Sequence, residues 1–160
     1  MTSWIEDSAE QVKRQHDTTQ KEREWQLHAS RVIRSRSGEV VEELEKVVRA
    51  DVDRWNAEFK SDPSKQVGDV SKILNGFRVR RTYYPAFTLE VCFDPESNTI
   101  RYQSAERRSM DSDPQQRRGV FRLSLSADGN IYLIHSDQPL SFEEASKLLL
   151  ESRLNVPLHT

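Results

Sequence analysis

The stretch from residue 86 to residue 93, AFTLEVCF, constrains this chain more than any other. Every second residue in it is large and apolar: Phe87, Leu89, Val91 and Phe93. A period of two is typical of a β-strand with one buried face. A proline stands immediately before the stretch and another shortly after it, which punctuates both ends. We therefore predict the central strand of an antiparallel sheet whose apolar face is covered by helices.

Four further segments complete a predicted five-stranded antiparallel meander. They are residues 77–84, 99–103, 119–126 and 131–135. Ala-Asp-Gly-Asn, between the last two, is a hairpin turn signal. Residues 66–74 have apolar residues at helical spacing but contain Gly68, so we predict a short helix or an irregular segment there. Residues 104–118 contain almost no apolar residues, which predicts a long connection that is mobile or functional.

The segment from residue 3 to residue 59 lacks proline and is predicted to be helical. Apolar residues follow helical spacing closely from Ile33 to Phe59, whereas the earlier half carries only a thin stripe. Ser35, Ser37 and Gly38 leave open a break that would give a helical hairpin. An unbroken helix would be about 85 Å long. It would exceed a compact domain of this size, so its first half must either fold back or project and meet another copy.

The C-terminal helix has the clearest local signal. Ser141 and Glu144 form a predicted capping box at its start. One face, which we expect to pack on the sheet, carries Phe142, Ala145, Leu148, Leu149 and Ser152. The predicted class is therefore α+β, and a strongly bent sheet closed by this last helix is the alternative. Residues 1–60 form the N-terminal helical segment and residues 61–160 the sheet with the C-terminal helix, together expected to be one structural unit.

The composition limits the classes of protein that the chain can belong to. Its 160 residues suit one domain with a single core. No run approaches the roughly 20 apolar residues that cross a bilayer, and the first ten residues lack the apolar segment of a secretory signal. The single cysteine rules out an internal disulfide. We expect a soluble, cytoplasmic protein that does not bind membranes.

Arginine is concentrated in the predicted sheet. The net charge is −2, so the whole chain has no attraction for nucleic acid. Residues 77–126, however, hold nine arginines against six acidic residues, a balance of +3. Four of these arginines alternate with apolar residues and would share the outer sheet face: Arg78, Arg80, Arg101 and Arg122. Such a face can bind an anion, a small ligand or single-stranded nucleic acid, or it can simply be solvated and paired with Glu90 and Glu106.

Residues with catalytic or metal-binding chemistry are few. Cys92 and His135 are the thiol and imidazole that fall on predicted strands, but Glu90 lies near Cys92 and disfavours its thiolate. The histidines are scattered at positions 16, 28, 135 and 159; Glu24 and His28 lie one helical turn apart but lack further ligands. A glycine-rich phosphate loop is missing from the sequence. We predict no catalytic residues, no metal and no cofactor, and a protein that is not an enzyme.

Tryptophans on the polar half of the first helix suggest a partner. Trp55 fits the apolar stripe of the second half and is predicted to be core. Trp4 and Trp25 lie where the helix is weakly amphipathic, and aromatic residues are enriched at interface cores. Burial against a folded-back helix is the alternative. The leading hypothesis is a non-enzymatic interaction or assembly module that binds a protein, possibly a second copy of itself as a homodimer, through Trp4 and Trp25. Nucleic-acid or ligand binding by the arginine face is the alternative function.

Overall fold

The computed structural model describes residues 3–155 of the chain. In order, the elements are α1 (Trp4–Glu58), the 3-10 turn η1 (Pro63–Lys65), β1 (Val70–Ile73), β2 (Gly76–Arg81), β3 (Ala86–Asp94), β4 (Thr99–Arg107), β5 (Gln115–Leu125), β6 (Ile131–His135), β7 (Gln138–Leu140) and α2 (Phe142–Leu154). Within these residues the strands form one antiparallel meander in the order β1 to β7. The α+β class is confirmed, with seven strands in place of the five predicted. The sheet is open, because β1 and β7 lie at its two edges.

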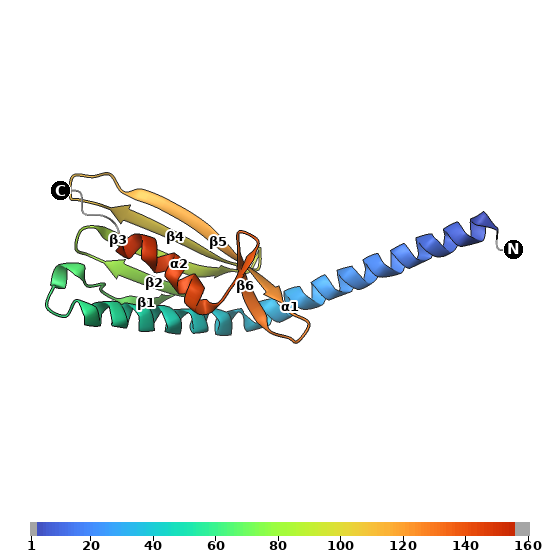
Figure 1. Cartoon of the computed structure of the whole chain (residues 1–160), viewed down its shortest axis with the longest axis horizontal. Coiled ribbons are helices and arrows are strands. Elements are labelled where there is room, and N and C mark those ends of the chain that lie inside the picture. Colours follow the sequence, from blue (N-terminus) through green and yellow to red (C-terminus); the bar gives the residue numbers. More distant parts are fainter. Residues whose placement is uncertain (1–2, 156–160) are drawn as a thin grey trace.

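One face of the sheet carries the core, as the alternation in β3 predicts. Phe87, Leu89, Val91 and Phe93 are all buried, and the residues between them are only half-buried. The second half of α1 and the whole of α2 cover this inner face (Figure 1). The two helices also contact each other, since Ser146 Oγ donates a 2.6 Å hydrogen bond to Asp51 Oδ2. The core is therefore shared by α1, the sheet and α2.

α1 is one continuous helix, so of the two alternatives left open by the sequence, one long helix or a helical hairpin, the first is found. The hydroxyls of Ser35 and Ser37 donate to the carbonyls of Val32 and Arg34, one turn earlier. They therefore remain bonded to their own helix and do not cap a second one. Gly38 has open space around its Cα and tolerates the helical conformation at a cost of about 1 kcal/mol relative to alanine. The first half of the helix projects from the body of the protein (Figure 1).

The end of α1 is tied to the segment that leads into the sheet. Trp55 is half-buried against the core, as predicted, and its indole N–H donates to the carbonyl of Lys65 at 2.6 Å. The Asn56 side chain accepts from the Val67 amide and donates to the Val67 carbonyl. These bonds satisfy backbone groups that lie outside regular structure. They hold the linker against the helix.

Two short edge strands, β1 and β7, were not predicted from the sequence. β1 falls where a short helix or irregular segment was predicted, because Val70 to Ile73 pair with the edge of β2 and this pairing outweighs a weak helical spacing. β7 follows a turn at Ser136 and Asp137, whose φ angles of 49° and 62° give the tight hairpin geometry. Both strands rely on neighbours to form. Their local sequence therefore carried little strand signal.

β4 and β5 are longer than predicted, which is a correction to the expected connection at residues 104–118. β4 runs to Arg107 and β5 begins at Gln115, so most of that stretch is paired strand. On the inner face of this extension, Ser104 lies opposite Arg117 and Glu106 opposite Gln115. The inner-face residues here are polar, so the segment lacks the alternating apolar residues from which a strand is predicted. For that reason the sequence did not predict the pairing of these residues.

α2 begins at the predicted capping box, with the Ser141 side chain bonded to the Glu144 amide and the Glu144 side chain to the Ser141 amide. The helix packs on the sheet, but its buried face is rotated from the predicted one. The buried residues are Ala145, Ser146, Leu149, Leu150 and Arg153. Ser152 is exposed, and Phe142 and Leu148 are only half-buried. Polar groups enter this face because each finds hydrogen-bond partners, as described below for Arg153.

Among residues 3–155, neither helix is long and apolar enough to cross a membrane.

Candidate functional site

The first half of α1 does not pack against the core. Every residue from position 3 to position 28 is exposed, which at 1.5 Å per residue is a free rod of about 40 Å. The last tether to the body is at Ser30, whose hydroxyl accepts a 2.6 Å hydrogen bond from the Asn98 amide of the β3–β4 turn. Figure 1 shows the rod leaving the body beyond this point. Its length and exposure make it a candidate contact surface.

The structure places both predicted partner-binding tryptophans on this rod. Trp4 lies at the tip and is 75% exposed; Trp25 lies at the base and is 46% exposed. They are not brought together within one chain. Trp25 borders a groove of about 340 Å³ between α1 and the start of β4 and end of β5, also lined by Ala29, Leu123 and Leu125. The base of the rod therefore offers an apolar groove, and its tip offers an apolar side chain.

Little within the chain stabilises the rod. Its N-cap is Ser3, whose hydroxyl accepts from the Glu6 amide at a long 3.4 Å. Its ion pair, Arg14 with Glu10 at 3.9 Å, is highly exposed, and such pairs contribute only a few tenths of a kcal/mol. Helices without tertiary packing are marginal in water, because most helical stability comes from burial of one face. A rod of this length gains most from a second surface.

Charge is unevenly distributed along the rod. Residues 3–17 carry four acidic and two basic side chains, a balance of −2. The rest of the rod, residues 18–28, carries two basic and two acidic side chains, a balance of 0, and Arg31, Arg34 and Arg36 follow where α1 meets the body. The tip of the rod is therefore acidic, and the basic side chains lie just beyond its base.

The four arginines predicted for the outer sheet face do lie on it, but three are paired. Arg78 binds Glu90 at 2.7 Å, Arg101 binds Asp94 at 3.0 Å and Arg122 binds Asp137 at 2.8 Å. Arg80 is exposed. The hydrogen bond from Arg78 lowers the pKa of Glu90 against the opposing effect of burial. These carboxylates neutralise much of the positive charge that phosphate binding would use. Binding of nucleic acid, an anion or a small ligand on this face stays a prediction.

Cys92 and His135 are not brought together. Cys92 is on the outer face of β3, and burial, then the charge of Glu90, raises the pKa of its thiol. His135 is on the inner face of β6, where its Nε2 lies 3.2 Å from the Tyr102 hydroxyl. Two strands separate β3 from β6 in the sheet. Among residues 3–155, no cluster of three potential metal ligands occurs either, and His159 falls outside the described residues.

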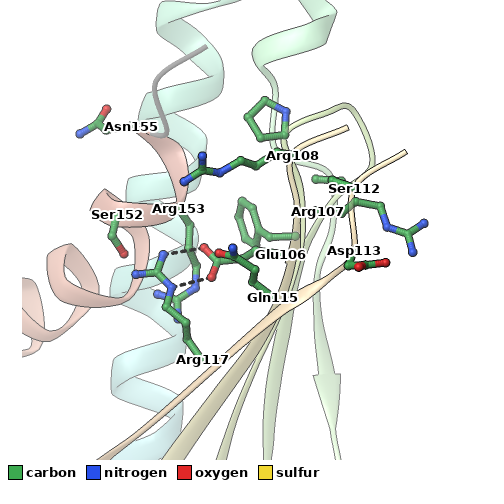
Figure 2. Close-up of a pocket in the computed structure, with 13 residues that line it drawn as sticks. Glu106, Arg107, Arg108, Ser112, Asp113, Gln115, Arg117, Ser152, Arg153 and Asn155 are labelled. Atoms are coloured by element: carbon green, nitrogen blue, oxygen red, sulfur yellow. Dashed lines mark hydrogen bonds and ion pairs between the residues drawn. The ribbon is translucent and has the colours of Figure 1, made fainter. Parts of the chain in front are cut away.

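A third site, which the sequence did not single out, lies at the inner end of β4 and β5 beside the end of α2. Two parallel 2.6 Å bonds join the guanidinium of Arg117 to the carboxylate of Glu106. Arg153, from α2, lies beside them (Figure 2). Arg107 points away from this cluster (Figure 2). The three side chains line a cavity of about 350 Å³.

The electrostatics of this cluster follow from two arginines beside one carboxylate. Burial alone would raise the pKa of Glu106, but the Arg117 hydrogen bonds and the charges of Arg117 and Arg153 lower it below its usual value. Burial lowers the pKa of Arg153, although arginine stays charged at any ordinary pH. Glu106 is thus an ionised, partly buried carboxylate that lies beside two cations.

Acid is expected to destabilise the protein through Glu106. Because its pKa is depressed in the folded state, its contribution is complete above the usual value of 4.5 and is lost as the pH falls through the folded pKa. Arg117→Gln should move this loss to higher pH, and Arg118→Gln, next on the strand but on the outer face, should not. Carboxyl titration by NMR with urea unfolding at each pH measures both. The same Glu106 midpoint in both variants would contradict the assignment.

Comparisons of the chain with protein-family models, with curated proteins and with solved structures found no significant match.

Proposed function

We propose that the protein is a non-enzymatic assembly module that self-associates by antiparallel pairing of the projecting half of α1. The observation that carries the proposal is the fully exposed rod from residue 3 to residue 28, with large apolar side chains along it. Ile5, Val12 and Leu27 are each more than half exposed, as is Trp4. Burying one such side chain is worth about 1.5–3 kcal/mol. Pairing would supply the packing that the rod lacks within one chain.

The charge distribution favours a second copy in the antiparallel orientation. Two parallel rods would set acidic tip against acidic tip, and the basic side chains beyond each base against one another. Two antiparallel rods would bring each acidic tip, with Glu6, Asp7 and Glu10, toward the other copy where its rod meets the body and carries Arg31, Arg34 and Arg36. This arrangement has two-fold symmetry, the commonest form of protein self-association. It would also carry Trp4 of one copy toward the groove beside Trp25 of the other.

The apolar stripe of the rod supports the same arrangement. Ile5, Ala9, Val12, His16 and Thr19 follow the alternating spacing of four and three residues that marks one side of a helix. The same spacing continues into Ile33, Val40 and Leu44, which are buried on the sheet. Polar residues, Arg23, Gln26 and Ser30, occupy the positions between, so the first half carries an exposed apolar stripe of its own. Small and polar residues within it predict a modest affinity.

Disruption of the stripe is expected to dissociate the assembly. In full-length protein, the double variant Ile5→Asp with Val12→Asp should raise the dissociation constant by about 100-fold or more, since four apolar side chains leave the symmetric interface. Sedimentation equilibrium measures this. Ser71→Asp with Gln116→Asp adds the same charge at exposed positions of the sheet, away from the rod, and is the matched control.

Salt gives an independent check on orientation. If complementary ends pair, added salt should weaken association of the wild type by screening the attraction. A wild type that is monomeric at every concentration tested would refute the proposal. So would a control variant that dissociates as readily as the stripe variant. We also propose that the protein is cytoplasmic, and this proposal rests on the sequence alone.

A further inference from the structure

Arg153 is a buried cation whose direct partners are all neutral. Its side chain is 3% exposed. One nitrogen donates to the carbonyl of Leu149 and another donates to the Ser104 hydroxyl at 2.8 Å. Its third nitrogen, Nε, is buried and has no partner among the described residues. Burying a charge without a direct counter-ion is costly, so an arginine that is buried without a carboxylate bonded to it is unusual in a protein interior.

Glu106 does not fully compensate this charge. Both of its oxygens are engaged by Arg117, at 2.6 Å each. Arg153 therefore receives only a longer-range attraction from a carboxylate that is already paired. The cluster of Glu106, Arg117 and Arg153 has a net charge of +1, with Arg153 buried, the Glu106 side chain 14% exposed and the Arg117 side chain 49% exposed. One further negative charge would balance it.

The cavity beside the cluster can accept such a charge. Its lining includes four arginines, at positions 107, 108, 117 and 153, against the acidic Glu106 and Asp113, a balance of +2. Phe87 and Ala86 provide an apolar wall. A volume of about 350 Å³ falls within the range of small-ligand sites in proteins. Figure 2 shows the charged residues of this lining around the space between β4, β5 and the end of α2.

We propose that this cavity binds a small molecule through an oxyanion, either a phosphate or a carboxylate, held by Arg117 and Arg153. Guanidinium groups present paired N–H donors that match the geometry of both anions. Glu106 then acts as an internal competitor that occupies Arg117 when the cavity is empty. The apolar wall would contact the remainder of the ligand.

The proposal is tested by anion titration of the full-length protein. Inorganic phosphate and acetate are added separately at constant ionic strength, with chloride as the balancing anion, and heat of binding and Tm are recorded. Saturable binding of one or both, with no effect of chloride beyond ionic strength, is the expected result, and the stronger binder identifies the anion class. If neither phosphate nor acetate gives saturable heat of binding or a higher Tm than chloride at the same ionic strength, the proposal is overturned.

Three variants locate the site. Arg117→Gln should weaken binding by about tenfold or more, since one charge-assisted donor pair is lost. Arg118→Gln, adjacent in sequence but on the outer face, should bind within about twofold of wild type and is the matched control. Glu106→Gln should strengthen binding by about tenfold, because the competing carboxylate is removed while both arginines remain. Equal losses in Arg117→Gln and Arg118→Gln, or weaker binding in Glu106→Gln, would refute the site.

Glu106→Gln still tests the proposal if the substitution lowers the stability of the protein. The variant leaves the buried Arg153 and the half-exposed Arg117 without a carboxylate, so an anion in the cavity should raise its Tm more than it raises that of the wild type. An equal or smaller rise would contradict the assignment of the cavity. This readout depends on the anion alone and not on the oligomeric state.

Discussion

Leu44→Ala is expected to lower the free energy of unfolding by about 2–5 kcal/mol. Leu44 lies in the second half of α1, is fully buried and packs in the shared core of helix and sheet. Truncation removes its burial and leaves a cavity beneath the helix, because the surrounding core relaxes only partly. Urea unfolding monitored by circular dichroism measures the loss.

The matched control for this prediction is Leu74→Ala. Leu74 lies in the turn between β1 and β2 and is 86% exposed. Its truncation should change stability by no more than about 0.5 kcal/mol. Comparable losses at the two positions would show that α1 does not pack on the sheet as described.

Gly76→Ala and Gly38→Ala are expected to shift stability in opposite directions. Gly76 begins β2 and lies against β3, where an added Cβ would overlap the backbone of Val91 and Cys92. Backbone cannot rotate away as a side chain can, so we expect a loss of about 3 kcal/mol or more. Gly38 is in α1 with open space around it. There, alanine should stabilise the helix by about 1 kcal/mol.

Tm measurements of both variants under one set of conditions check this pair. Because the two substitutions are chemically identical, differences in hydrophobicity or volume cannot explain opposite signs. A gain at Gly76, or a loss at Gly38 comparable with that at Gly76, would contradict the register of β2 with β3 or the continuity of α1 through residue 38.

The two proposed sites lie at opposite ends of the protein. The rod leaves the body at one end, whereas the cavity is beside the far end of α2 (Figure 1). Variants of Glu106 or Arg117 should therefore leave the oligomeric state unchanged, and the stripe variants should leave anion binding unchanged. Failure of one proposal does not affect the other.

The adjacent arginines at positions 117 and 118 show where pattern analysis falls short at the candidate site. Successive side chains of a strand point to opposite faces, so one of this pair had to face inward once the segment was a strand. The segment looked like a loop, because its inward residues are polar. Arg117 could be placed inside only when Glu106 on β4 and Arg153 on α2 were seen to meet it.

Local patterns determined the α+β class, the buried face of β3, the capping box of α2 and the helical nature of residues 4–58, since each depends on a period or on a cap within a few residues. Tertiary structure decided the rest. It showed that α1 is unbroken with its first half exposed, that β1 and β7 join the sheet, and that α2 turns Ser146 and Arg153 inward. Those outcomes depend on pairing and burial between residues far apart in the chain, where long-range contacts outweigh weak local preferences.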